Sequence, residues 1–260
     1  KVQRNRFGFK PRPRVLIGIP YGVTEVEQRA VEEAALNAGA REVYLIEEPV
    51  AAAIGARLPI QEATGSMIVD IGGGTSEVAV ISLGSIVASR SLRVAGDELN
   101  QDIINYVRDT FKLVLGERTA EEVKISSGSA LPLKQRLRVV LRGRDLVSGL
   151  PKQIDTDDEH IRKSMQKSLA VIIEAVRETI EETPPELVAD IMERGIVLAG
   201  GGALLRGLNM ILATATGTKV HIADDPLTAV ARGAGVVIED LSSLKGVLLP
   251  SQHRRLDRVK

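Results

Sequence analysis

The 260-residue sequence predicts an α/β protein built from two related lobes. The length exceeds that of a usual single domain, and strand-like and helix-like segments alternate, which is typical of a mostly parallel sheet flanked by helices. A block also recurs: RVLIGIP, a helix and GAREVYLIEEPVAAAIGA are echoed by GIVLAGGG, a helix and GTKVHIADDPLTAVARGAG, with Pro49 and Pro226 at matching points. Chance likeness between α/β units is the alternative, but the shared acid-acid-proline-small order favours duplication.

The individual elements follow from local patterns of apolar and turn residues. Strands are expected at 14–20, 42–46, 67–71, 77–83, 85–95 and 195–200. Helices are expected at 24–39, 97–115, about 158–182, 203–216 and 226–240. The first helix has Thr24 as its N-cap and Glu27 as the capping-box partner. The stretch 67–95 suggests antiparallel strands, and 117–157 breaks the alternation as a small inserted subdomain would.

Composition excludes several classes of function. The 34 basic and 34 acidic side chains balance, so charge gives no reason to expect nucleic acid as a partner. The absence of cysteine excludes thiol catalysis, disulfides and Cys-ligated zinc, and fits a reducing compartment. The three histidines are scattered and form no metal-ligand set, and no apolar run is long enough to span a membrane.

The two repeated helices are made of small residues. Each follows two acids and a proline, which suits the first position of a helix. The small residues are Ala51, Ala52, Ala53 and Gly55 in one helix, and Ala229, Ala231, Gly233 and Gly235 in the other. They would let two helix backbones approach closely, either where the helices cross at a hinge between the lobes or in an ordinary packed pair within one lobe.

The segment DIGGGTSEV, residues 70–78, predicts a hairpin whose tip carries almost no side chains. Bare amides at Gly72, Gly73 and Gly74 can surround a phosphate, and Asp70 can hold Mg²⁺ through water. A simple tight turn is the alternative. The segment is neither a Walker loop nor a dinucleotide fingerprint, because no GxxxxGK[ST] occurs and a strand follows the glycines.

A second cluster, Gly200, Gly201 and Gly202 in LAGGGALLRGL, lies between a strand and a helix. It would let a flat base and its sugar lie against the backbone, although a plain turn would use the same residues. Its place after DIGGGT and before a proline-alanine helix favours a nucleotide site.

Together these motifs resemble the superfamily of actin, sugar kinases and heat-shock chaperone ATPases. EEPVAAAIG resembles its connect 1 motif, DIGGGTSEV phosphate 2, LAGGGALLRGL the adenosine motif, and DDPLTAVARGAG connect 2. Within that superfamily the sequence most resembles the MreB family of bacterial actin homologues. The resemblance covers nearly the whole chain, through segments such as VDIGGGTSEVAVISLGSIV, AGDELN, GERTAEEVK and TPPELVADIMERGIVLAGGGALLRGL.

The resemblance implies an α/β, actin-like (ribonuclease H-like) fold with duplicated domains, in which mixed sheets are flanked by helices. It assigns residues 1–57, joined by 236–260, to a first lobe, 58–98 and 164–235 to a second, and 99–163 to an inserted subdomain. The family's D-x-G-T phosphate 1 hairpin has no counterpart, since the only D-x-G is Asp70 to Gly72. This absence and the lack of an initiator methionine suggest a piece with an incomplete first lobe and an impaired site.

The resemblance also implies roles for single residues, with ATP and Mg²⁺ as cofactors. Glu48 would orient the water that attacks the γ-phosphate, with Thr75 assisting, while the neighbouring Glu47 is either a second candidate or a helix cap. Glu121 and Lys124 would reach the ribose and adenine, unless they belong to a solvated helix face.

Phe7 and Phe9 stand among five basic residues in RNRFGFKPRPR, where they suit either an anionic membrane interface or the core.

The function implied is that of a cytoplasmic, slowly ATP-hydrolysing filament protein on the inner face of the membrane. It would self-assemble, work with cell-wall elongation proteins and direct cell-wall synthesis and rod shape. The alternatives are a non-polymerising ATPase of the superfamily, such as a chaperone ATPase module or a sugar kinase, and a regulatory binding module that has lost catalysis.

Overall fold

The computed structural model describes residues 12–250, which form three sheets. In the first, β1 (Arg14–Ile19) and β2 (Glu42–Glu47) run parallel, joined by α1 (Glu25–Asn37). The predicted capping box begins α1, because the Thr24 amide donates to Glu27 Oε2 over 2.9 Å and the Thr24 side chain accepts from the Glu27 amide. The backbone amide of Leu249 donates to the carbonyl of Leu45 over 2.9 Å, so the last described residues lie against β2.

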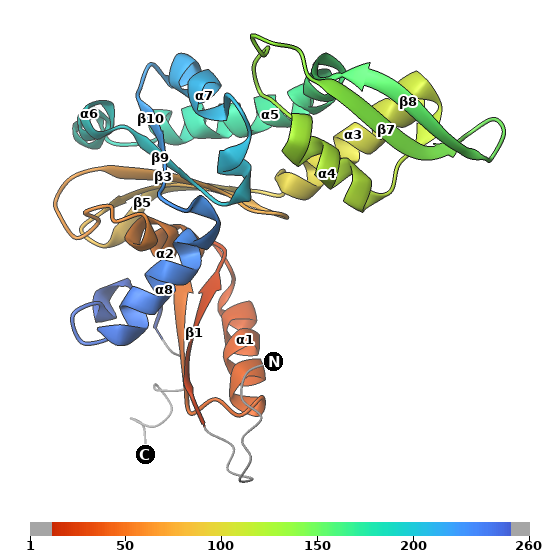
Figure 1. The fold of residues 1–260 in the computed structure, drawn as a ribbon. Helices are drawn as coiled ribbons and strands as arrows, with labels where there is room; N and C mark the ends of the chain where they lie inside the picture. The colour runs from red at the N-terminus through yellow and green to blue at the C-terminus, as the bar shows by residue number, and fades with distance from the viewer. Residues whose placement is uncertain (1–11, 251–260) are drawn as a thin grey trace.

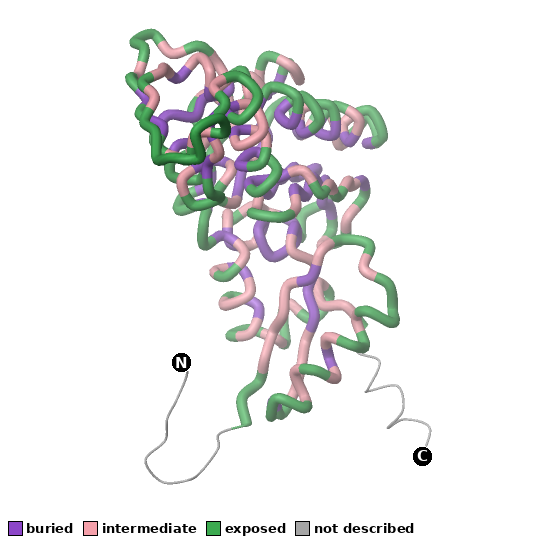
Figure 2. Tube along the Cα trace, turned by 90° about the vertical axis from the view of Figure 1, so that its right-hand side faces the viewer, coloured by how far each residue is buried: buried purple, intermediate pink, exposed green. Residues whose placement is uncertain are grey.

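The second sheet is mixed and has five strands in the order β10-β9-β3-β4-β5. The strands are β3 (Ser66–Ile71), β4 (Ser76–Ser82), β5 (Ser85–Leu92), β9 (Ile196–Ala199) and β10 (Val220–Ile222). β10, β9 and β3 are parallel, whereas β3, β4 and β5 form an antiparallel meander. Every residue of β3 and β4 is buried, so this sheet forms the centre of the molecule (Figure 2).

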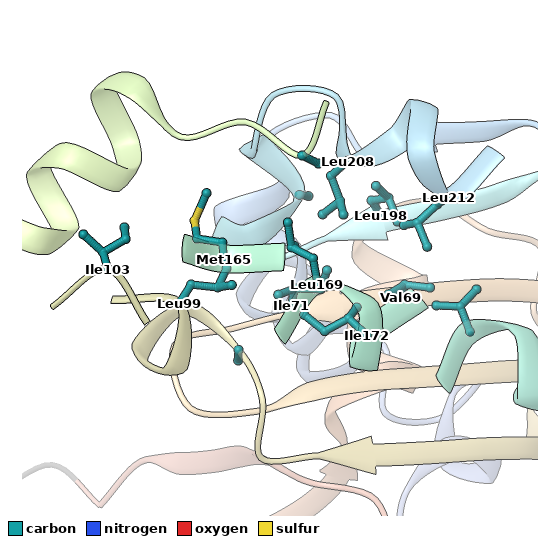
Figure 3. Close-up of a cluster of buried hydrophobic side chains, with 14 of the residues drawn as sticks. Val69, Ile71, Leu99, Ile103, Met165, Leu169, Ile172, Leu198, Leu208 and Leu212 are labelled. Carbon is teal, nitrogen blue, oxygen red and sulfur yellow. The ribbon is translucent and has the colours of Figure 1, made fainter. Parts of the chain in front are cut away.

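Helices cover both faces of the five-stranded sheet (Figure 1). One face, with Val69, Ile71 and Leu198, packs against α3 (Gly96–Phe111), α5 (Asp158–Glu181) and α7 (Leu208–Thr216), as Figure 3 shows. The opposite face packs against α2 (Glu48–Gly55) and α8 (Ala229–Glu239), which lie between the two sheets.

The two small-residue helices α2 and α8 cross in direct backbone contact. A Cβ added to Gly55 would lie 1.8 Å from the carbonyl oxygen of Ala229, and one added to Gly233 would lie 1.8 Å from that of Ala51. No larger residue fits at these two glycines, which explains why the chain repeats the thin helix. The helices separate the β1–β2 sheet from the five-stranded sheet; a hinge motion at this crossing stays a prediction.

A third, antiparallel sheet lies beyond α3. It contains β6 (Leu113–Val114), β7 (Arg138–Asp145) and β8 (Pro151–Asp157), with α4 (Glu117–Ser127) beside it. The helix predicted at 97–115 is wrong at its end, because Lys112 takes a left-handed conformation with φ of 54° and the next two residues pair with β7. The domain ranges drawn from the sequence stay a prediction, since strand pairing does not define domain boundaries.

Three further elements differ from the sequence prediction. The helix expected at 203–216 is divided into the 3-10 turn η1 (Gly201–Leu204) and α7, because Gly207 adopts φ of 75° and Arg206 bridges to Ser129. The helix expected at 226–240 begins with the 3-10 turn η2 (Pro226–Thr228) before α8, and the strand expected at 85–95 ends at Leu92.

Three helical elements lie outside the predicted helix ranges: α4, α6 (Pro185–Arg194) and the 3-10 turn η3 (Lys245–Val247). None of the helices in the described part combines the length and apolar character needed to cross a membrane.

Candidate nucleotide site

The hairpin between β3 and β4 presents bare backbone at its tip. The amide of Gly72 donates to the carbonyl of Thr75 over 2.9 Å and closes the turn, while Gly73 and Gly74 are exposed. Within residues 12–250, the amides of Gly73 and Gly74 donate to no protein acceptor. The tip therefore offers free N–H donors of the kind that bind a phosphate.

The start of α3 holds this hairpin in place. The amides of Gly96 and Asp97 donate to the carbonyls of Gly72 and Gly73 over 3.1 and 2.8 Å. Lys124 of α4 reaches the same junction, where its Nζ donates to the carbonyl of Gly96 over 2.7 Å. Burial lowers the pKa of Lys124, and the nearby carboxylates of Glu121 and Asp97 oppose this shift. Glu121 itself is exposed.

The second glycine cluster lies directly beside the hairpin. β9 pairs with β3 so that Ala199 faces Asp70, and Gly200 follows alongside Ile71. A Cβ on Gly200 would lie 2.3 Å from the carbonyl oxygen of Ile71 and 2.4 Å from Asp70 Oδ1. A Cβ on Gly202 would lie 2.2 Å from Ile71 Cγ2. These two glycines thus allow the two motifs to pack together, a role that the sequence prediction, which placed a base and sugar there, did not include.

The predicted acids gather at the same end of the sheet. Glu48 is the first residue of α2, and its Cγ lies 3.2 Å from where a Cβ of Gly18 would be. Burial raises the pKa of Glu48 and of Glu47. Glu47 stands at the N-cap but makes no capping hydrogen bond, so the capping role considered for it is wrong.

Asp70 is the most strongly perturbed of these acids. It is 8% exposed, and burial, with a smaller contribution from Glu48, raises its pKa to about 6. A carboxylate held so unfavourably in the free protein gains from a nearby cation. No three His, Asp or Glu side chains in the described part are arranged to hold a metal directly. A hydrated Mg²⁺, which needs only one or two carboxylates, nevertheless fits Asp70.

The sequence analysis did not single out Glu77, a buried acid beside the candidate site. It pairs across the hairpin with Asp70 and is 2% exposed. Burial raises the pKa of Glu77, and Glu48 and Asp70 add to that shift, while hydrogen bonding from the Ser91 side chain and from the backbone of Tyr21 opposes it. The signal was present, since Glu77 is the only charged residue in the otherwise apolar run EVAVI.

The structure brings most of the predicted residues to one hairpin: Glu48, Asp70, Lys124, Gly200 and Gly202 lie beside the tip formed by Gly72, Gly73, Gly74 and Thr75. It does not place Glu121 or Gly201 against the hairpin, since Glu121 is exposed near Lys124 and Gly201 faces Leu227. Thr75 is half-buried and its carbonyl closes the turn. Phe7 and Phe9, predicted to contact a membrane, lie outside the described residues.

The class of protein follows from three features, and it is an actin-like protein. These features are the two repeated strand-helix-strand-helix blocks, the bare hairpin beside a second glycine turn, and the two helices that cross between the sheets. Comparison with known proteins narrows this class. The family model described as MreB/Mbl protein matches residues 1–246, so the chain belongs to the MreB/Mbl family.

Individual relatives agree with this assignment. The chain is 50% identical over 252 residues to the cell shape-determining protein MreB of Escherichia coli strain K12, which covers 97% of this chain and 72% of that protein. Crystal structures of MreB5 of Spiroplasma citri bound to ADP and to AMPPNP are 39% and 38% identical, with TM-scores of 0.85 and 0.87. They cover 88% and 92% of this chain, and the matches span 69% and 72% of those chains. A MamK double helical filament, 20% identical with a TM-score of 0.75, shares the fold over 89% of this chain and 71% of its own.

Proposed function

We propose that the chain is an ATP-binding, ATP-hydrolysing, actin-like cytoskeletal protein that forms membrane-associated filaments and directs cell-wall synthesis and rod shape. The observation that carries this proposal is the packing of Gly200 and Gly202 against Asp70 and Ile71, which lead into the bare hairpin tip at Gly72–Gly74, with Glu48 at the start of the adjacent helix. Membership of the MreB/Mbl family and the nucleotides bound by MreB5 of Spiroplasma citri support it.

The residues suit phosphoryl transfer to water. The free amides of Gly73 and Gly74 would bind the phosphate chain, and Lys124 and Glu121 would contact the nucleoside from α4. Glu48 would accept a hydrogen bond from the attacking water, with Thr75 assisting. The water oxygen forms a bond to the γ-phosphorus while the bond to the β,γ-bridging oxygen breaks. ADP leaves with that electron pair, and the displaced proton is released with the products.

Asp70 is the residue that would hold Mg²⁺ through its hydration shell. When bound, Mg²⁺ supplies positive charge that offsets the phosphate oxygens. A bound cation would also favour the ionised form of Asp70, whose pKa of about 6 reflects burial without a counter-charge.

Self-assembly, membrane contact and cell-wall partners are part of the proposal. The MamK filament supports self-association among proteins of this fold, and the name of the Escherichia coli relative supports a role in cell shape. The protein would act in the cytoplasm, on the inner face of the membrane, through Phe7 and Phe9.

A sedimentation assay for filament formation distinguishes this function from the alternatives. The protein, in its longest natural form, is centrifuged with ATP or ADP, with and without anionic liposomes. We expect pelleting that depends on ATP, and Glu48→Ala should still pellet while releasing phosphate more slowly. Sugar-dependent ATP turnover without pelleting would identify a non-polymerising kinase. Pelleting without any phosphate release would identify a binding module.

A further inference from the structure

The loop between β7 and β8 exposes three apolar side chains at one end of the molecule. Leu146, Val147 and Leu150 are 47%, 88% and 64% exposed. The loop closes the β7–β8 hairpin at its free end, away from the five-stranded sheet (Figure 1). Single exposed apolar residues are common on protein surfaces, but a group of them marks a contact surface.

Hydrogen bonds fix the backbone of this β7–β8 loop. Asp145 Oδ1 accepts from the amides of Val147 and Ser148 over 2.7 and 3.2 Å, and its Oδ2 lies 2.6 Å from Lys152 Nζ. The amide of Gly149 donates to the carbonyl of Asp145 over 2.9 Å. A surface whose backbone is already ordered loses little conformational entropy on binding, so the loop is preorganised for a partner.

The β7–β8 loop has a basic border. Arg142 and Arg144 precede it on β7, and the carbonyl of Lys112 accepts a hydrogen bond from the Leu146 amide over 2.8 Å. All three basic residues are exposed, while the charge of Asp145 is balanced by Lys152. A surface that complements the loop is therefore apolar with an acidic border.

The outward face of α6 has this character. Its exposed residues form an apolar line with an acidic line next to it, namely Pro185, Ala189 and Met192 beside Glu186 and Glu193. Met192 is 62% exposed, whereas Ile191 is buried on the other side of the helix. The basic Arg194 at the end of α6 is paired with Glu62. The acids of this α6 face are thus available to a basic partner.

The β7–β8 loop and the α6 face lie at opposite ends of the molecule (Figure 1). The helix α5 connects them, since it begins directly after β8 and ends shortly before α6. Its 24 residues span about 36 Å. The two surfaces therefore cannot meet within one chain, but they can meet between two copies. Because such a contact joins different surfaces, it leaves one of each free and repeats into an open chain.

We propose that the β7–β8 loop docks on the α6 face of a second copy of this chain, as one head-to-tail link between filament subunits. This inference rests on the proposed function, which includes self-assembly. In this contact Val147 packs against Met192, and Arg144 lies beside Glu193.

The test blocks each surface separately in the longest natural form of the protein. Val147→Asp places a charge on the β7–β8 loop, and Met192→Asp places one on the α6 face. Both side chains are exposed, so neither change disturbs the core. Val26→Asp on α1, where the side chain is 79% exposed, is the matched control. Sedimentation with ATP gives the critical concentration for assembly, and thermal unfolding and AMPPNP affinity show whether each variant is folded.

We expect each blocked variant to raise the critical concentration at least about tenfold, with the control equal to the wild type. A mixture of the two blocked variants should form 1:1 dimers in analytical ultracentrifugation, because one supplies the loop and the other the α6 face. These dimers should not extend.

A critical concentration equal to that of the wild type in either blocked variant would overturn the inference. So would two defective variants that form no mixed dimer, because the two surfaces are then not partners. If Val147→Asp assembles normally with ATP but no longer pellets with anionic liposomes, the loop binds lipid instead. A folded wild-type protein that never pellets with ATP would overturn the proposed function and this inference together.

Discussion

The crossing of α2 and α8 leads to a quantitative prediction for Gly233→Ala. The new Cβ would lie 1.8 Å from the carbonyl oxygen of Ala51, and real Cβ atoms do not approach within 3.0 Å. The helices must therefore separate by at least 1.2 Å locally, and the obstacle is backbone that cannot rotate away. Overpacking of this kind costs about 1–3 kcal/mol, and at the upper end this outweighs the gain of about 1 kcal/mol from replacing glycine within a helix.

The net expectation is a loss of about 2 kcal/mol in the free energy of unfolding. For a chain of this size that corresponds to a midpoint of thermal unfolding about 4–8 °C lower. Circular dichroism during heating and during urea titration measures both quantities.

Gly235→Ala in the same helix is the matched control. No atom lies within 4 Å of its added Cβ, and its φ is not positive, so only the helix propensity changes. This variant should be more stable than the wild type by up to about 1 kcal/mol. If Gly233→Ala proves as stable as Gly235→Ala, the close backbone contact between α2 and α8 is not present in solution.

Three further predictions concern the site. Gly74→Ala should fold with wild-type stability, because its Cβ meets no atom within 4 Å, yet it should weaken ATP binding in titration calorimetry. Equal ATP affinity in this variant would argue against a phosphate at the tip. Gly200→Ala should unfold at a clearly lower temperature, because Gly200 has a φ of 76° and its added Cβ would lie 2.3 Å from the carbonyl oxygen of Ile71. The pKa of Asp70 is raised from 3.8 to about 6, so the nucleotide-free protein should lose up to about 3 kcal/mol of stability as pH rises through that interval. Urea titrations at several pH values should show that Asp70→Asn lacks this loss. The same pH dependence in Asp70→Asn and in the wild type would contradict the prediction. Lys124→Met should lower the free energy of unfolding by about 1 kcal/mol, because the hydrogen bond from Nζ to the carbonyl of Gly96 is lost. It should also reduce nucleotide affinity, and an affinity equal to that of the wild type would exclude Lys124 from the site.

Local patterns predicted most of the elements because their causes are local. The capping box at Thr24, the proline at the start of α2 and the glycine hairpin are each visible within a few residues. The end of α3 was missed because Lys112, which is not a usual left-handed residue, stops the helix in that conformation. The helix α6 was missed although Pro185, the second of two prolines, is its first residue, a position that proline commonly takes.

The composition of the site was predictable only where a motif carried the information. The hairpin at 70–78 and Glu48 were predicted from their sequence context. The packing role of Gly200 and Gly202 was not, because it depends on β9 lying next to β3 although more than 120 residues separate them. Glu77 was missed because its place beside Asp70 comes from the pairing of two strands, which no single segment reveals.

The two crossing helices also begin at the site. Glu48 is the first residue of α2, and the amide of Gly200 donates over 2.9 Å to the carbonyl of Pro226, where the turn leading into α8 starts. Because α2 and α8 touch backbone to backbone at Gly55 and Gly233, neither axis can shift sideways alone. We predict that a displacement at the hairpin end turns both axes as a pair, which would couple the spacing of the acids to the angle between the two sheets.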